Sequence, residues 1–320
     1  MDLHLLVDNL TNPALLFFIL GILASQVKSD LEIPKNSSKF ISLYLLLSIG
    51  FKGGQELAHS TYNTDILYAL IAGIVLALAV PFYTFFILRL KFTVDNAGAI
   101  AAAYGSVSAV TFVTSVSFLE LEGISFGGHM VAVMALMEAP SIIIGVLLMR
   151  LYSNGKKSTK ELLGLLKHAV TNGSVLLILG SLLIGFIASD AQAEGIKPFT
   201  TDIFKGFLAV FLLDMGITSG QKIGALVKKG WFALAFAIVI PILNGIFIAK
   251  LSGLFLTQDG DRFLLSILAA SASYIAVPAA MRIAAPKANP SLYLPMALAI
   301  TFPFNITLGM PMYMYIIQTF

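Results

Sequence analysis

The chain has 320 residues, of which 58% are hydrophobic and only 12% are charged, and its formal net charge is +3. Ordinary globular domains carry about 25% charged residues, and a soluble fold of this length could not bury so much apolar surface. The composition therefore predicts a polytopic membrane protein with no room for a soluble domain. Cysteine is absent, which excludes disulfides, thiol catalysis and cysteine-based metal sites.

Ten apolar segments, each near the ~20 residues that cross a bilayer as a helix, follow one another along the chain. The residues before the first segment include Asp2 and Asp8 but no lysine or arginine, so they lack the basic region of a cleaved signal peptide. We therefore expect the first segment to be a retained span and the fold to be all-α. The segments are placed at residues 12–28, 38–57, 64–90, 96–119, 126–152, 171–189, 202–223, 231–256, 261–283 and 290–318.

Two glycine-rich tails indicate an internal duplication. Segment two ends in SIGFKGGQ at residues 48–55, and segment seven ends in DMGITSGQ at residues 214–221. An offset of 166 aligns Gly50 with Gly216, and almost the same offset aligns segment four with segment nine. Because a unit of five spans is odd, its second copy enters the membrane the other way up, which predicts inverted repeats.

The predicted organisation is a first repeat at residues 1–155, a linker at residues 156–170 and a second repeat at residues 171–320. Positive charge supports it, because 15 of the 20 lysines and arginines follow odd-numbered segments and cytoplasmic loops collect such residues. Both termini are therefore predicted to lie outside. The linker is interpreted as a basic topogenic connection rather than a regulatory site.

Small and polar residues interrupt segments four and nine. The interruptions read AAAYGSVSAVTFVT at residues 101–114 and AASASYIAVPAAMR at residues 269–282. Weak helix formers are unusual in the middle of a span, and frayed backbone at that depth is tolerated only where it is buried in protein or lines a cavity. Two such places in corresponding repeats predict one shared binding site, which is typical of a secondary transporter.

Broken helices direct their amide ends toward an anion, which can then be held without a buried lysine or arginine. Their carbonyl ends suit a cation. For each serine at the breaks, a hydrogen bond to the preceding turn or between packed helices is the structural alternative. The candidate anion-binding residues are Gly105, Ser106, Ser108, Thr111, Ser271 and Ser273.

Glu138 lies well inside segment five, where an ionisable side chain is by default a functional hypothesis. It could ligate Na⁺, carry a proton or pair with a basic group, and a hydrogen-bonded carboxylic acid is the structural alternative. Asn305 occupies the corresponding region of segment ten and is a second candidate cation ligand.

Charged residues near the segment ends are expected to be interfacial or solvated. Lys52 and Asp214 lie near span ends, where a lysine can reach the interface. Glu120, Glu122 and His129 belong to a predicted outer loop region with no basic residue and are expected at the surface.

The sequence contains no Walker loop, nucleophile elbow, metal-binding spacing or nucleic-acid footprint. These absences exclude ATP-driven pumping by this chain alone and give no indication of an enzyme. No cofactor is expected beyond Na⁺ as a coupling ion.

Three stretches resemble the SbtA-type sodium-dependent bicarbonate permeases: GSVSAVTFVTSVSFLELEGI at residues 105–124, MEAP at residues 137–140 and AASASYIAVPAAMRIAAPKANPS at residues 269–291. The resemblance implies two inverted five-span repeats, a core domain with two crossed discontinuous helices, and a separate gate domain. It also implies bicarbonate uptake with Na⁺, a homotrimer, and inhibition by a PII-like protein from the cytoplasmic side.

Residue by residue, the resemblance places Ser108 and Thr111 in the first broken helix and Glu138 at the position of an aspartate. Tyr274 occupies the place of a carboxylate that serves sodium, so we include it at the cation site. A neutral tyrosine cannot replace that charge, which weakens the expectation of sodium coupling there.

The expected function is import of a small inorganic anion, bicarbonate first, across the inner membrane by alternating access and driven by a Na⁺ or H⁺ gradient. One alternative is a cation/proton exchanger in which Glu138 alternates between a proton and Na⁺. A second is a transport-inactive membrane sensor, consistent with Tyr274.

Overall fold

The computed structural model describes residues 7, 9–60, 63–153, 173–227 and 230–320, and these residues form helices joined by short connections. The all-α expectation is confirmed over these ranges. The predicted linker at residues 156–170 lies outside them.

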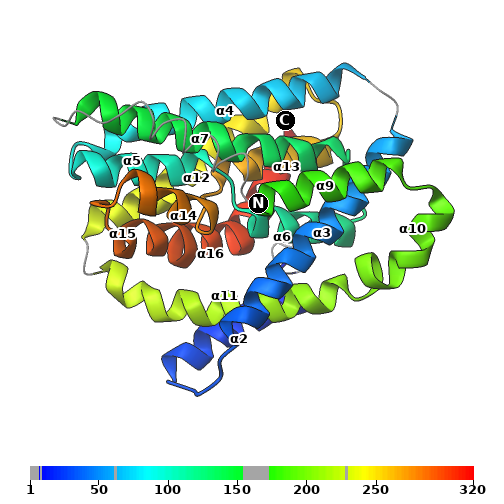
Figure 1. The fold of residues 1–320 in the computed structure, drawn as a ribbon, viewed down its shortest axis with the longest axis horizontal. Helices are drawn as coiled ribbons and strands as arrows, with labels where there is room; N and C mark the ends of the chain where they lie inside the picture. Colours follow the sequence, from blue (N-terminus) through cyan, green and yellow to red (C-terminus); the bar gives the residue numbers. More distant parts are fainter. Residues whose placement is uncertain (1–6, 8, 61–62, 154–172, 228–229) are drawn as a thin grey trace.

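The first half of the chain contains six described helices of the kind that the apolar segments predict (Figure 1). Segment four is divided between two of them. The helices are α2 (Pro13–Gln26), α3 (Lys35–His59), α4 (Thr64–Leu88), α5 (Val94–Gly105), α6 (Ala109–Leu121) and α7 (His129–Tyr152).

The second half is more interrupted. Segment nine is divided between α13 and α14, and segment ten alternates between α-helical and π-helical turns, Met296–Thr301 and Asn305–Gly309 being π-helical. A further π-helical turn, Pro198–Asp202, precedes α11. The helices are α9 (Gly173–Ile187), α10 (Asp190–Lys197), α11 (Phe204–Val227), α12 (Trp231–Leu251), α13 (Asp259–Ala270), α14 (Ala276–Ala284), α15 (Pro290–Pro295), α16 (Phe302–Phe304) and α17 (Met310–Thr319).

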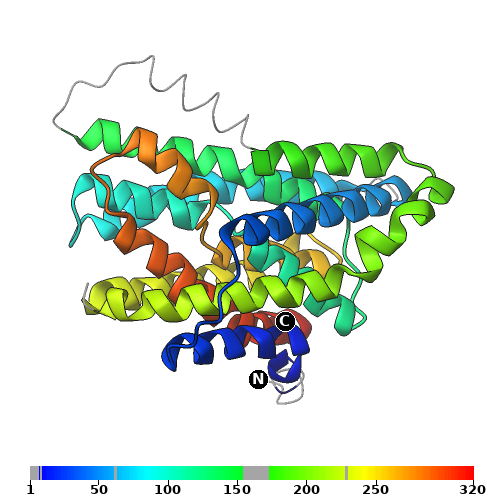
Figure 2. The ribbon, with the colours of Figure 1, turned by 60° about the horizontal axis from the view of Figure 1, so that its bottom comes forward.

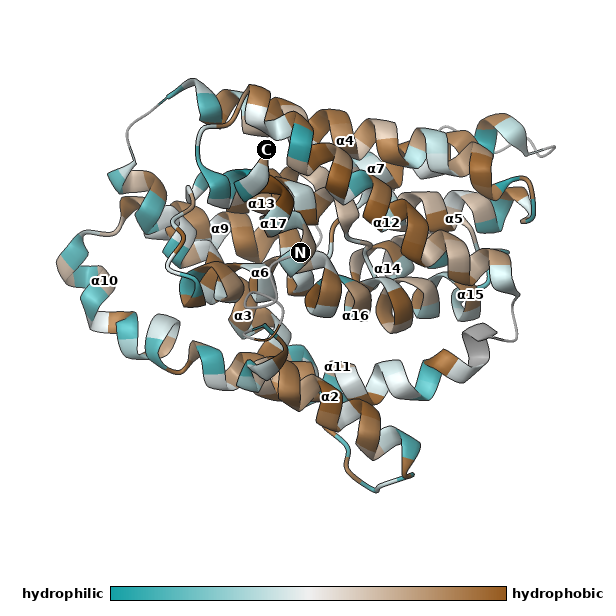
Figure 3. Cartoon of the chain, turned by 180° about the vertical axis from the view of Figure 1, so that it is seen from behind, coloured by the Kyte–Doolittle hydropathy of each residue, from teal (hydrophilic) through white to brown (hydrophobic). Residues whose placement is uncertain are grey.

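Six helical stretches among the described residues are long and apolar enough to cross a membrane, and α2 and α9 are shorter apolar helices. Hydrophobic residues predominate along α4 and α12, whereas α10 is polar (Figure 3). Exposed residues such as Leu67 and Val75 on α4 and Phe247 on α12 would be unfavourable in water. The molecule is therefore a multi-pass membrane protein.

Four helices form two closely packed pairs, α2 with α11 and α3 with α9, which we call the paired-helix group (Figure 2). A methyl group on Gly54 of α3 would collide with the Leu182 carbonyl oxygen of α9, and one on Gly216 of α11 would collide with the Phe18 carbonyl oxygen of α2. Glycine lets the helix backbones approach this closely. The glycines in the aligned tails of segments two and seven thus lie where these helices contact their partner helices.

Apart from the short connecting helix α10, the remaining helices, α4 to α7 and α12 to α17, form a second body that we call the broken-helix group. Within it α4, α5 and α7 pack together, and α13 packs against α12 and α17. The Phe118 and Phe263 rings stack with centroids 5.3 Å apart and join α6 to α13. Both interrupted helices lie in this group.

The interruptions follow from local sequence. Gly105 and Ser106 are weak helix formers, and Ser108 begins the next helix as its N-cap, its Oγ accepting a hydrogen bond from Thr111 N at 3.2 Å. On the other side, Ser271 is extended after α13, and Pro278 falls in the first turn of α14, where its missing N–H is tolerated. Each helix therefore ends and restarts within a few residues.

Candidate functional site

The two breaks are hydrogen-bonded to each other. Ser273 N donates to Ala103 O at 2.8 Å, and Ser108 N donates to Ser271 Oγ at 3.1 Å. These bonds bring the ends of four half-helices together from positions more than 160 residues apart in the chain. The two small-residue stretches therefore lie in contact with each other.

The amide ends of α6 and α14 line one cavity of about 30 Å³. This is roughly twice the space that one water molecule needs, so a small polyatomic group is the scale of ligand that it suits. The first residues of the two helices, Ala109 and Ala276, both contribute to the lining. Because helix N-termini carry partial positive charge and free N–H groups, the cavity favours an anion.

The carbonyl ends of α5 and α13 are held by side-chain donors. Asn244 Nδ2 donates to Ala269 O at 3.1 Å and Asn305 Nδ2 donates to Ala270 O at 2.8 Å. On the other broken helix, Ser141 Oγ donates to Gly105 O at 2.6 Å. These contacts leave the carbonyls only their second lone pairs for a cation.

The predicted serines have different local roles. Ser108 and Ser273 line the cavity. Ser108 is also the N-cap of α6, and Ser273 Oγ accepts a hydrogen bond from Val277 N in the first turn of α14 at 3.4 Å. Ser271 Oγ is engaged twice, accepting from Ser108 N and donating to Leu268 O at 3.0 Å. The remaining predicted residues, Gly105, Ser106 and Thr111, are buried in the first break and its flanking helices without lining the cavity.

Glu138 of α7 lines the same cavity as Ser108 and Ser273. Its Oε1 atom is buried and has no hydrogen-bond partner within the described residues. A buried carboxylate without a partner is costly, so uptake of a cation or a proton by this group would be favourable. No lysine or arginine lines the cavity among the residues that the structure describes.

Asn305 lies elsewhere in the site. It is fully buried in a π-helical turn, and its side-chain amide caps the carbonyl end of α13, whereas Glu138 lies at the amide ends of α6 and α14. The Asn305 Oδ1 atom has no hydrogen-bond partner in the described part of the chain. The structure therefore does not bring Glu138 and Asn305 into one cavity.

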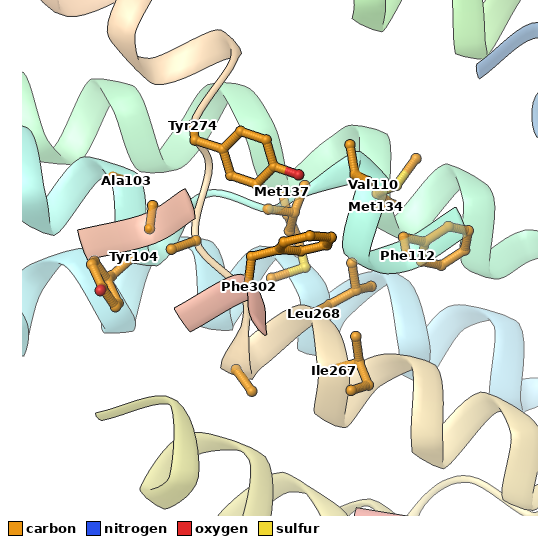
Figure 4. Packing of buried hydrophobic residues seen from close by; sticks show 14 of the residues in the cluster. Ala103, Tyr104, Val110, Phe112, Met134, Met137, Ile267, Leu268, Tyr274 and Phe302 are labelled. Atoms are coloured by element: carbon orange, nitrogen blue, oxygen red, sulfur yellow. The ribbon is translucent and has the colours of Figure 1, made fainter. Parts of the chain in front are cut away.

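Tyr274 turns inward at the second break. Its ring packs edge-on against Phe302 with centroids 5.8 Å apart, and the residue is 8% exposed. Figure 4 shows its hydroxyl directed to the side on which Val110 of α6 lies. Tyr274 lines the cavity, and its buried hydroxyl lies near the Ser108 side chain without forming a hydrogen bond of normal geometry with the described residues. It can donate a hydrogen bond to an anion, which a carboxylate at the same place could not.

Two of the charged residues that were expected at the surface have partners instead. His129 is buried, with its Nε2 atom 3.5 Å from Asp261 Oδ2. Glu120 is only partly exposed, its Oε1 lying 2.5 Å from Lys52 Nζ. The expectation of solvated side chains was wrong here because helices distant in sequence pack over the predicted outer loop.

Asp214, which was expected at the membrane interface, is likewise buried against another helix. The residue is 9% exposed, and its Oδ2 accepts a hydrogen bond from Ser38 Oγ of α3 at 2.5 Å. The contact joins α11 to α3 inside the paired-helix group.

Sequence reasoning missed two residues that shape the breaks. Ser141 Oγ also contacts Ala77 O and Met137 O, at 2.9 and 3.0 Å, and so ties α4 and α5 to α7. Asn244 accepts a hydrogen bond from Tyr83 Oη while it holds the end of α13. A polar residue in the middle of an apolar span was the available signal for both.

These features define an all-helical, multi-pass membrane protein with two interrupted helices joined at a small polar cavity. The family model of the Na⁺-dependent bicarbonate transporter superfamily matches residues 13–318, and the chain belongs to that superfamily. This confirms the resemblance drawn from the sequence motifs and identifies a transporter rather than an enzyme. No curated protein matches the chain.

Proposed function

We propose that this chain is a secondary active transporter that imports bicarbonate with Na⁺ across the inner membrane by alternating access. The observation that carries the proposal is the cavity in which two helix N-termini, serine hydroxyls and Glu138 meet. Membership of a Na⁺-dependent bicarbonate transporter superfamily supports the choice of ions.

The cavity suits reversible anion binding. The amide ends of α6 and α14 supply partial positive charge, and Ser108, Ser273 and Tyr274 supply hydroxyls. Because the described lining has no basic side chain, the anion is held by dipoles and can be released. Ser106, Thr111, Ser271 and Gly105 support this arrangement by shaping the breaks.

Glu138 provides the physical basis for coupling. An ionised carboxylate in the same cavity repels bicarbonate, whereas a carboxylate neutralised by Na⁺ or a proton does not. Binding of the cation and the anion is then mutually favourable, which is the thermodynamic requirement for symport. Asn305 offers an unpartnered oxygen near the second break for a further cation contact.

The contacts of the paired-helix group support ten spans in two inverted repeats. Segment two packs on segment six as α3 on α9, and segment seven packs on segment one as α11 on α2, each through aligned glycines. Such reciprocal pairing is expected of two copies related by a twofold axis in the membrane plane. The paired-helix group then serves as the gate domain and the broken-helix group as the core domain.

Contacts between the two helix groups support the proposal that this conformation is inward-facing. On the predicted outer side, Lys52 of α3 pairs with Glu120 of α6, and a methyl group on Gly128 would collide with the Gly53 carbonyl oxygen. On the predicted cytoplasmic side, a cavity extends from Tyr274 to the first turns of α3. Alternating access requires the outer contacts to separate.

The homotrimer and the inhibition by a PII-like protein are proposals that rest on the family resemblance alone. Light scattering of the purified protein measures the subunit number, and a mass corresponding to one chain would contradict the trimer.

Uptake of labelled bicarbonate into proteoliposomes tests the function directly. We expect an inward Na⁺ gradient to stimulate uptake more than an inward proton gradient or no gradient. Glu138→Gln removes the charge at nearly constant size and should abolish the stimulation, whereas Glu138→Asp keeps the charge and should retain part of it. Stimulation by a proton gradient instead of a Na⁺ gradient would indicate that the coupling ion is a proton bound by Glu138.

The cation/proton exchanger is a second candidate, because the buried Oε1 of Glu138 lacks a partner within the described residues. It predicts proton release when Na⁺ is added in the absence of bicarbonate. Na⁺ uptake that depends on bicarbonate would contradict it. Absence of flux under every gradient, in folded protein, would favour the transport-inactive sensor.

A further inference from the structure

A second, larger cavity adjoins the cavity at the helix breaks. It has a volume of about 320 Å³ and is bounded by α3, α11 and the second break. We call it the basic vestibule. The two cavities share four lining residues and so lie next to each other: Ser42, Ser174, Tyr274 and Ile275.

Two lysines line the basic vestibule at the start of α3. Lys35 and Lys39 are one turn apart, and neither forms an ion pair within the described residues. The acidic group beside them is Asp214, whose carboxylate accepts the hydrogen bond from Ser38 Oγ. The charged residues in the described lining of the vestibule are both lysines, so its wall is positive, and a cleft of one sign concentrates ions of the opposite sign.

Hydroxyl groups extend this positive surface inward. Ser38 and Ser42 of α3 line the vestibule, and Tyr274 closes its deep end. Tyr274 lines both cavities, and its buried hydroxyl, near the Ser108 side chain, forms no hydrogen bond of normal geometry with the described residues. An unpartnered donor deep in a positive cavity indicates a ligand with acceptor oxygens.

We propose that the basic vestibule is a second anion-binding position, which holds a small oxyanion such as bicarbonate between Lys35, Lys39 and the Tyr274 hydroxyl. The inference rests on the proposed transport function and adds a position in series with the cavity at the breaks. It lies on the lysine-rich side that the charge pattern predicts to be cytoplasmic. An anion that leaves the inner cavity would keep its contact with the Tyr274 hydroxyl and gain the two lysines.

The absence of cysteine from the sequence permits a direct test on purified protein in detergent. Ser42→Cys places a thiol in the vestibule, where an anionic and a cationic methanethiosulfonate reagent of similar size report the local charge. We expect the anionic reagent to react about tenfold faster. Lys35→Gln with Lys39→Gln should remove that preference.

The matched control is the pair Lys91→Gln and Lys287→Gln, which makes the same change in net charge at exposed loops that do not line the vestibule. The control should keep the preference for the anionic reagent. Leu43→Cys, also in the lining, replaces Ser42→Cys if that variant fails to fold.

Bicarbonate protection then tests binding rather than charge alone. Bicarbonate should slow the anionic reagent at Ser42→Cys in a saturable way at constant ionic strength, and the lysine double variant should lose this protection. Equal reaction rates for the two reagents, or no protection in protein with intact lysines, would overturn the proposal. Because the assay needs no flux, protection without any bicarbonate uptake would contradict the proposed import and leave the vestibule site standing.

Discussion

At the scale of single residues, the ring and the hydroxyl group of Tyr274 have different roles, packing for the ring and proposed ligand binding for the hydroxyl. Its ring contacts Phe302, while its hydroxyl has no partner in the described part of the chain. The two functions can therefore be changed independently.

Tyr274→Phe should raise the KM for bicarbonate uptake about fivefold, because a neutral hydrogen bond contributes about 1 kcal/mol. The melting temperature should not fall, since the substitution keeps the ring and removes an unpartnered polar atom. Tyr315→Phe, at an exposed position on α17, is the control and should leave KM unchanged. An unaltered KM in Tyr274→Phe would exclude the hydroxyl from anion binding.

At the scale of helices, the glycine contacts hold the paired-helix group together. Gly54 packs directly against the backbone of α9, so any side chain there forces α3 and α9 apart. Since α3 also carries Lys35, Lys39 and Lys52, its position on α9 affects both the vestibule and the predicted outer contact.

Gly54→Ala should destabilise the protein by about 1–3 kcal/mol through overpacking, measured as a lower midpoint of thermal unfolding in detergent. Gly180→Ala lies on α9 with open space around it and should be neutral or slightly stabilising, because alanine favours the helix. Equal midpoints for the two variants would contradict the close approach of α3 and α9.

At the scale of the whole molecule, the two helix groups contact each other at several places, and on the predicted outer side Lys52 and Glu120 form an ion pair between them. Lys205 of α11 lies farther away, with its Nζ 3.9 Å from Glu120 Oε2. The Lys52 and Glu120 side chains are 29% and 26% exposed, so the pair contributes at most about 1 kcal/mol. A contact of this strength suits a closure that must open in every transport cycle.

Lys52→Gln should raise the rate at which an external thiol reagent modifies Val116→Cys, which lines the cavity beside Lys52 and Glu120. A change of about two- to fivefold corresponds to a surface ion pair. Exchanging the charges with Lys52→Glu and Glu120→Lys should restore the slow rate. Lys197→Gln removes an ion pair within α10 alone and should have no effect; a similar increase there would show that the Lys52 contact is not specific.

Much of the architecture can be predicted from short stretches of the sequence. Apolar runs, the lysine and arginine alternation and the weak helix formers at residues 105–108 and 271–275 lie within short stretches of the chain, and the helices break at both predicted places. Glu138 was also recognisable, because a carboxyl group inside an apolar span is rare enough to indicate a function by itself.

The sequence by itself therefore determined the class of protein, the two helix breaks and the family motifs. Only the tertiary structure decided that Tyr274 turns inward, that Asn305 caps α13 away from Glu138, and that Ser108 and Ser273 line the cavity. The physical reason is that these outcomes depend on hydrogen bonds between chain positions far apart, such as Ser108 to Ser271. Composition and periodicity describe how one segment meets lipid or protein, whereas the choice of partner depends on how the segments pack.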